Sequence, residues 1–247
     1  MLTGGRARCN APPSYYFAAF PGGRRGAERN VAVKSVWRAM RAAAVALVLA
    51  GLPAGVALAA PTPAPLTAMD TLELQRIAAY LNAIHTMTAD FRQVAGGNRV
   101  STGKMWVARP GKMRFEYNPP SPIVLLADSK SVYYWDKQLN ETSKYPLRDT
   151  PAWFFLRDPI DFGSDVIVTG FQHLNDNIVR VTVVERKEPD AGSLTLDFSE
   201  KPLALRQWTV VDQQGKVTTV TLSDTRFGVA LDPRLFQYQY LFTGSNH

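Results

Sequence analysis

The chain is poor in the residues that most enzyme and metal sites require. It has a single cysteine, Cys9, which lies within the first sixty of its 247 residues. A disulfide framework, a thiol nucleophile and a cysteine-ligated metal are therefore excluded from the rest of the chain. Histidine is almost as scarce, because His85, His173 and His247 are the three in the sequence and they are scattered. We expect no metal site and no cofactor.

Catalytic motifs are also missing. The sequence contains no G-x-S-x-G elbow, no phosphate-cradling glycine loop and no H-E-x-x-H helix. Asp158, Asp161 and Asp165 cluster in DPIDFGSD and could bind calcium, but their spacing matches no known calcium loop. We interpret this segment as a solvated turn, and we expect the protein not to be an enzyme.

The net positive charge of the chain comes from its first sixty residues. Of 28 lysines and arginines, eight precede residue 61, and Glu28 is the one acid among these residues, so the segment carries 8 − 1 = +7. The remaining 20 basic and 20 acidic residues cancel. The high isoelectric point therefore says nothing about nucleic acid, and we expect no nucleic-acid partner.

An export signal follows the basic segment. Residues 37–61, WRAMRAAAVALVLAGLPAGVALAAP, combine two arginines, an apolar run and an A-L-A cleavage site. We predict a signal peptide at residues 40–59 with cleavage after Ala59, an upstream extension or misplaced start at 1–39, and one mature domain at 60–247. A retained membrane anchor is the alternative, because residues 42–60 are uncharged and about long enough to span a bilayer. Either way, a cysteine-free exported chain of bacterial type indicates the periplasm.

The mature chain is predicted to be mainly β with two helices. Apolar residues at helical spacing predict an amphipathic helix from about Thr67 to Arg92. Thr150-Pro151 followed by four apolar residues and then Pro159 predicts a short, buried second helix. Turn signals separate about eleven predicted strands of an antiparallel meander. They lie near residues 100–109, 112–118, 122–127, 131–136, 139–146, 164–171, 178–186, 193–198, 203–211, 216–226 and 235–240.

The segment GKMWVARPGKMRFEYNPP, residues 103–120, reads as a hairpin closed at Pro110-Gly111. A two-residue turn would pair Trp106 with Phe115 and place both on one apolar face with Met113. Arg109 would then fall on the polar face as a solvated turn residue. Because Pro-Gly fits the twist of a hairpin poorly, a wider loop could shift this register by one residue.

Several segments together resemble the periplasmic outer-membrane lipoprotein carrier (LolA) family. These are the first helix running into TADFRQ at 88–93, GKMWVARP at 103–110, the strand beginning Met113-Arg114-Phe115, and ADSK at 127–130 with its aromatic strand. Thr150-Pro151 is similar to the start of the family's short lid helix. Ser129 stands where the family usually has glycine, and we expect the C-terminal extension of some members to be absent.

The resemblance implies an incomplete, open antiparallel β-barrel of about eleven strands with a helical lid over a hydrophobic cavity. It implies a monomeric carrier that takes acylated lipoproteins from an inner-membrane ATP-binding-cassette lipoprotein exporter and hands them to an outer-membrane lipoprotein acceptor. Arg109 would latch the lid, and Met113 would lie at the cavity mouth. We expect the acyl-chain cavity to be formed by Trp106, Met113, Phe115, Tyr117, Leu125, Tyr134, Leu74, Ile77, Leu81, Trp153, Phe154 and Phe155.

One alternative of another class stays open. The same half-barrel could be a regulatory module that senses mislocalised lipid or lipoprotein through a protein partner, without transferring cargo. A stable protein partner and a retained membrane anchor would favour that interpretation.

Overall fold

The computed structural model describes residues 61–174 and 177–242. The predicted export signal, its cleavage site and the upstream extension lie outside these residues, as does His247. Within them, the structure consists of one large sheet, two α-helices and a few short 3-10 helices. No helix in this part of the chain combines the length and the apolar character needed to cross a membrane.

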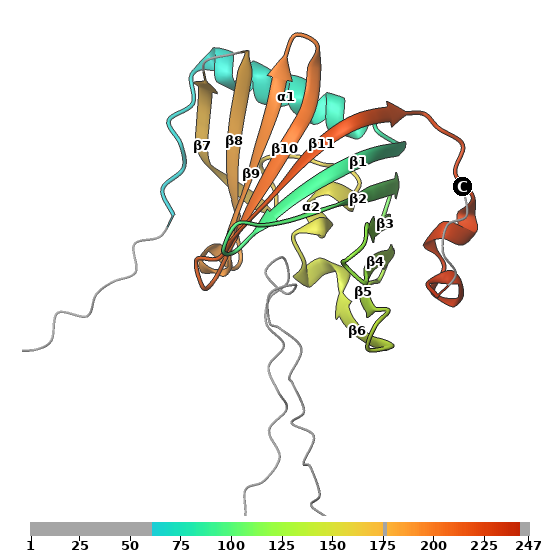
Figure 1. Ribbon diagram of the computed structural model, residues 1–247. Helices are drawn as coiled ribbons and strands as arrows, with labels where there is room; N and C mark the ends of the chain where they lie inside the picture. Colours follow the sequence, from blue (N-terminus) through green and yellow to red (C-terminus); the bar gives the residue numbers. More distant parts are fainter. Residues whose placement is uncertain (1–60, 175–176, 243–247) are drawn as a thin grey trace, which may run out of the picture. The chain divides into compact units, whose positions relative to one another are not determined.

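The sheet contains eleven antiparallel strands in the order β6-β5-β4-β3-β2-β1-β11-β10-β9-β8-β7 (Figure 1). Strands that follow one another in the chain pair with each other, except β6 and β7, which lie at the two edges of the sheet. The contact between β1 and β11 joins the two meanders into one sheet. The strands are β1 (Thr86–Ala95), β2 (Arg99–Ala108), β3 (Lys112–Tyr117), β4 (Ile123–Asp128), β5 (Ser131–Asp136), β6 (Glu141–Pro146), β7 (Val166–Leu174), β8 (Ile178–Glu185), β9 (Gly192–Glu200), β10 (Leu203–Asp212) and β11 (Val217–Phe227). The open antiparallel sheet predicted from the sequence is confirmed.

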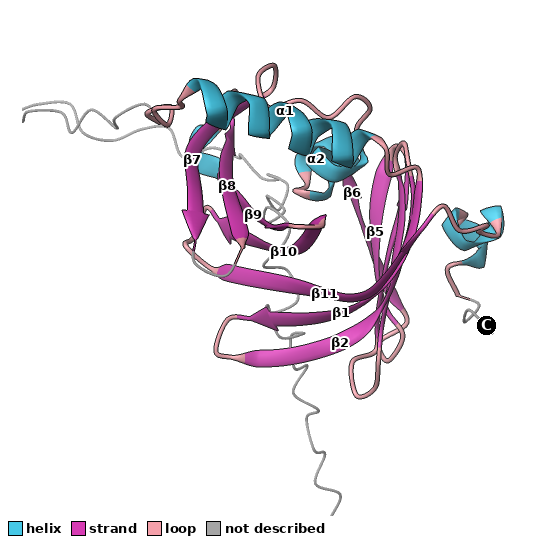
Figure 2. Ribbon diagram, turned by 90° about the horizontal axis from the view of Figure 1, so that it is seen from above, coloured by secondary structure: helices cyan, strands magenta, loops and turns pink. Residues whose placement is uncertain are grey.

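The sheet curves, and two helices lie on its concave side (Figure 2). Helix α1 (Ala68–Asn82) begins with a capping box between Thr67 and Asp70, and it buries Leu74, Ile77 and Leu81. Helix α2 (Ala152–Leu156) lies in the connection from β6 to β7 and buries Phe154 and Leu156. The short second helix predicted from Thr150-Pro151 is therefore present, with five residues.

The predicted end of the first helix was wrong. Helix α1 stops at Asn82, and residues 86–95 form β1, with Met87, Ala89 and Phe91 buried at alternate positions. The spacing of four between Met87 and Phe91 fits a helical face, but it is also a multiple of the strand period. Pairing of β1 with both β2 and β11 decided in favour of the strand.

The eleventh predicted strand, near residues 235–240, was also wrong. This segment forms the 3-10 helices η4 (Pro233–Phe236) and η5 (Tyr238–Tyr240). The predicted count of eleven still holds, because the missed strand β1 replaces it. The other 3-10 helices are η2 (Leu147–Asp149) and η3 (Pro189–Ala191).

The loop between β2 and β3 is one residue longer than the two-residue turn considered from the sequence. Ala108 pairs with Lys112, Trp106 with Arg114, and Met105 with Phe115. The loop has three residues, and Gly111 adopts a left-handed φ of +81°, which suits a three-residue hairpin. The shift by one residue moves Trp106 to the opposite face of the sheet from Phe115.

The convex face of β2–β5 carries its own apolar cluster. Trp106, Val124, Leu126, Tyr133 and Trp135 pack there against Phe236 and Leu241 of the C-terminal segment. Arg114 fixes this segment, because its guanidinium is 1% exposed and donates to the carbonyl oxygens of Leu235 (3.2 Å) and Leu241 (3.4 Å). The placement of Trp106 in an acyl-chain cavity is therefore corrected: Trp106 belongs to this outer cluster.

Candidate functional site

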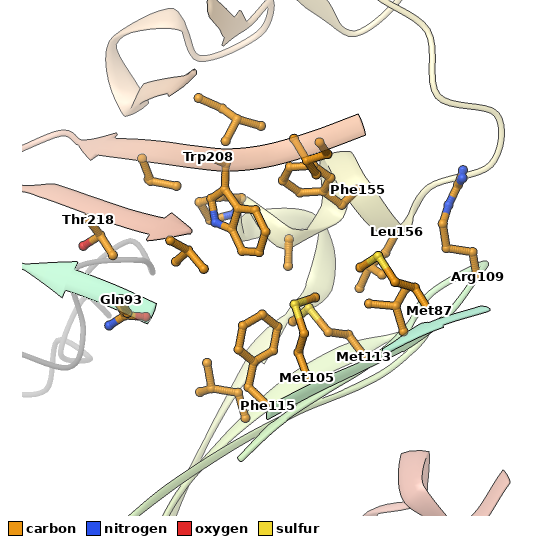
Figure 3. Close-up of a pocket in the computed structure, with 18 of the residues that line it drawn as sticks. Met87, Gln93, Met105, Arg109, Met113, Phe115, Phe155, Leu156, Trp208 and Thr218 are labelled. Carbon is orange, nitrogen blue, oxygen red and sulfur yellow. The ribbon is translucent and has the colours of Figure 1, made fainter. Parts of the chain in front are cut away.

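An apolar cavity lies between the concave face of the sheet and the two helices (Figure 3). Its volume is about 120 Å³. Among the described residues that line it, Arg109 is the only charged one.

Eight of the residues predicted for the site line this cavity. Leu81 comes from α1, Met113, Phe115 and Tyr117 from β3, Leu125 from β4, Tyr134 from β5 and Phe155 from α2, and Arg109 lies at one end.

The other predicted residues do not line the cavity. Leu74 and Ile77 are buried earlier on α1. Trp153 lies against the guanidinium groups of Arg148 and Arg157, each 4.8 Å from its ring centre. Phe154 packs against Phe162, at 5.7 Å between ring centres, and against Phe155. Four consecutive apolar residues on one short helix cannot all face one cavity, and Phe155 is the aromatic residue of α2 that does.

Much of the cavity wall was missed from the sequence. Met87 and Met105, which were not predicted, lie beside the predicted Met113 on one side of it, and the three come from neighbouring strands (Figure 3). Trp208 comes from the other meander and lies 5.2 Å from the ring of Phe155. Strand periodicity does not predict this arrangement: Leu205 and Trp208 are three residues apart and still line the same cavity, because the pairing of β10 with β9 is irregular between Leu205 and Gln207. The remaining lining residues are Ile84, Gln93, Val107, Ile123, Pro151, Ala152, Leu156, Ile160, Leu194, Leu205, Val210, Thr218 and Val220.

Arg109 joins the strand β2 to both helices. Its guanidinium donates to the carbonyl oxygens of Leu81 and of Ile84 (3.3 Å) at the end of α1, and to that of Arg157 (2.6 Å) after α2. It also contacts Asn82 Oδ1 at 3.4 Å. Burial lowers the pKa of Arg109, and the nearby Asp158 opposes that effect. The solvated turn position expected from the two-residue hairpin was therefore wrong.

Arg157 fixes the carbonyl group that receives Arg109. Its side chain, 7% exposed, lies over the rings of Trp153 and Phe154 and pairs with Asp165 at 3.2 Å. It also donates to the backbone carbonyl of Asp161. Burial lowers the pKa of this arginine, while Asp161 and Asp165 raise it. The side chain of Arg157 thus fixes the end of α2, and the carbonyl group of Arg157 accepts a hydrogen bond from Arg109.

The acidic segment DPIDFGSD forms a tight turn. The carboxylate of Asp161 accepts hydrogen bonds from the backbone N–H groups of Gly163 (2.9 Å) and Ser164 (2.6 Å), and from the Ser164 hydroxyl (2.7 Å). No cluster of metal-ligating side chains occurs within residues 61–174 and 177–242. The residues that line the cavity are mostly apolar, with Arg109 at one end.

Comparison with known proteins agrees with this geometry. The family model "Outer membrane lipoprotein carrier protein LolA" matches residues 82–239. An outer-membrane lipoprotein carrier protein of Chromohalobacter salexigens is 29% identical over 187 residues, covering 71% of this chain and 87% of the relative. One from Legionella pneumophila is 30% identical over 172 residues, covering 64% of this chain and 81% of the relative.

A putative outer membrane lipoprotein-sorting protein domain from Vibrio parahaemolyticus has a similar structure, with a TM-score of 0.47 at 10% identity over 69% of this chain and 97% of that one. Since the family model covers well over half of the sequence, the chain belongs to the LolA family of outer membrane lipoprotein carrier proteins, which are transport proteins and not enzymes.

Proposed function

We propose that this protein carries acylated lipoproteins across the periplasm. It would receive them from an inner-membrane ATP-binding-cassette exporter, shield their acyl chains, and pass them to an outer-membrane acceptor. The observation that supports this proposal most directly is the apolar cavity under α1 and α2, with one arginine at its end. Carriers of this family are periplasmic, and the predicted signal peptide at residues 40–59 fits that location.

Burial of hydrocarbon is sufficient to hold such cargo. Each methylene group removed from water contributes about 0.8 kcal/mol, so ten of them contribute about 8 kcal/mol without any polar contact. The three methionines of the wall suit chains of varied shape, because a methionine side chain adapts easily.

The closed cavity must open to take this cargo. Its volume of about 120 Å³ suits a short hydrocarbon segment and not several long chains. Opening would move α1 and α2 away from the sheet and break the hydrogen bonds of Arg109. Hydrogen bonds to a charged group contribute about 1.5–3 kcal/mol each, so reforming them in the empty protein would offset part of the cost of release.

Cargo analysis tests this proposal. Protein isolated from native periplasm should carry acylated lipoprotein, identified by mass spectrometry, and its depletion should leave outer-membrane lipoproteins in the inner membrane. Normal sorting after depletion would contradict the proposal. A stable protein partner in pull-downs without cargo transfer would instead favour the sensing module, and N-terminal sequencing of the mature protein would show whether the signal is cleaved after Ala59.

A further inference from the structure

The cavity has a polar end, opposite the arginine. Gln93 and Thr218 line this end, far from Arg109 and Met113 (Figure 3). They lie on adjacent strands: Gln93 of β1 pairs with Val220 of β11, and Thr218 is two residues from Val220 on the same face. Diagonal neighbours of this kind lie about 7–8 Å apart in an antiparallel sheet, so one small polar group could contact both.

Thr218 carries a hydroxyl group without a partner. The residue is 3% exposed, and its Oγ1 atom makes no hydrogen bond within the described part of the chain. Leaving a buried hydroxyl unpaired is unfavourable, and valine would fill the same space without that cost. On the other face of the same strand, Thr219 bonds Thr209 at 3.0 Å, so an unpaired hydroxyl is not a general property of β11.

Gln93 is held so that its amide nitrogen stays available. The Tyr117 hydroxyl donates to Gln93 Oε1 at 2.7 Å across β2, and this contact orients the amide group. Gly103 lies between Phe91 and Tyr117 on the middle strand. Because it has no side chain to separate them, the ring of Tyr117 can lean across β2 toward β1. The accepting oxygen of Gln93 is thus used, while its N–H donors remain for another group.

We infer that Gln93 and Thr218 together receive the carbonyl oxygen of an acyl ester. This inference rests on the proposed carrier function and adds an orientation to it. The ester would lie at Gln93, which is half-buried and reaches solvent, while the hydrocarbon tail runs toward the methionines and Phe155. Two donors match the lone pairs of a carbonyl oxygen, whereas a hydrocarbon chain would leave the buried hydroxyl of Thr218 unpaired.

Paired ligands of equal length test this inference. Methyl laurate and tetradecane are used to displace an apolar fluorescent probe from wild-type protein and from the Thr218→Val variant. We expect Thr218→Val to weaken methyl laurate binding about fivefold, the effect of one net hydrogen bond, and to leave tetradecane binding unchanged. The thermal midpoint of the empty variant should not fall, since the lost hydroxyl has no partner.

Two further variants make the test specific. Gln93→Leu should also weaken the ester selectively, whereas Thr219→Val, on the outer face, should change neither ligand. The inference is wrong if Thr218→Val changes both ligands by the same factor or changes neither. If neither ligand displaces the probe from the wild type, the proposed carrier function fails and the inference fails with it.

The ester carbonyl could belong to a lipoprotein or to a membrane lipid, and competitors separate these sources. A diacylglyceryl lipopeptide should compete better than phosphatidylglycerol with the same acyl chains. If phosphatidylglycerol competed better, lipoprotein cargo would be contradicted. The role of Gln93 and Thr218 would still be decided by whether their variants selectively lose methyl laurate binding.

Discussion

At the scale of single residues, Arg109 is hydrogen-bonded to the ends of both helices, and we propose that it holds them closed. Removal of its guanidinium in Arg109→Leu should destabilise the closed, empty protein, because several hydrogen bonds to α1 and α2 are lost. If opening to take cargo breaks these bonds, as we propose, the loaded protein loses less. We expect the variant to load cargo but to transfer it to acceptor membranes at least tenfold more slowly, because about 1.4 kcal/mol corresponds to a factor of ten.

A fluorescence assay of lipopeptide transfer to acceptor liposomes measures this effect. Arg148→Leu is a suitable control, because Arg148 is 53% exposed and contacts α2 through Trp153. Unchanged transfer by Arg109→Leu would exclude the latch role.

His173 makes one contribution to stability dependent on pH. Its ring bonds Glu200 at 2.9 Å and lies 3.8 Å from Asp70 of α1. The hydrogen bond to Glu200 raises the pKa of His173 above 6.5, with smaller effects from Asp70 and Glu73. A raised pKa means that the charged form stabilises the fold below about pH 6.5, and that this stabilisation disappears as the pH rises through the folded-state value.

The substitution His173→Gln should therefore lower the free energy of unfolding at about pH 5.5 and have little effect at about pH 8.5. The difference should stay under about 1 kcal/mol, because the side chain is 55% exposed and solvent screens the pairs. Urea unfolding at the two pH values, with His85→Gln as control, measures it. An equal loss at both pH values would show that the charge is not responsible.

At the scale of elements, the packing of β1, β2 and β3 depends on Gly103. A Cβ atom at this position would collide with the carbonyl oxygen of Glu116 and lie 2.7 Å from the ring of Phe91. Phe91 in turn contacts Phe115 at 4.9 Å and Tyr117 at 5.0 Å between ring centres. The glycine therefore lets an aromatic group close over the strand beside the cavity.

Gly103→Ala should destabilise the protein by about 3 kcal/mol, at the upper end of the usual cost of overpacking, because a backbone atom must move. Gly163→Ala is the matched control: its Cβ would meet only Asp161 Oδ1, at 3.9 Å, and we expect a change within about 0.5 kcal/mol. Chemical denaturation compares the two variants. If the two variants were equally stable, the sheet would accommodate a Cβ atom at Gly103 at little cost.

At the scale of the whole described unit, the curved sheet has two apolar faces covered by different segments. The helices cover the concave face, and the segment containing η4 and η5 covers the outer cluster of β2–β5. Arg114 links this segment to the sheet and pairs with Glu116 at 2.6 Å. Removing one partner of a buried ion pair usually costs about 3–5 kcal/mol, so this contact is a sensitive point.

Arg114→Met should loosen the C-terminal segment and expose it to chymotrypsin at Tyr238 and Phe242, which are 42% and 46% exposed in the intact protein. We expect cleavage there to accelerate at least tenfold, whereas Arg226→Met, on the exposed end of β11, should leave the rate unchanged. Mass spectrometry of the fragments identifies the cut. Slow cleavage of Arg114→Met would mean that the apolar contacts alone retain the segment.

The sequence by itself determined the mainly antiparallel fold, the helix before it, the short helix at Pro151 and the apolar character of β3. Local periodicity and turn residues carry that information. The family resemblance added the arginine at the W-x-x-R-P segment. Neither could separate a helix from a strand at residues 86–92, since apolar residues four apart fit both.

Only the tertiary structure decided which apolar residues face the cavity. One extra loop residue at Arg109-Pro110-Gly111 sent Trp106 outward and brought Met105 and Val107 inward. Pairing of β1 with β11, distant in sequence, brought Gln93 and Thr218 to one end of the cavity. The alternation of residues along a strand does not say which face will be concave. Only the curvature of the assembled sheet makes one face the inside of a binding site.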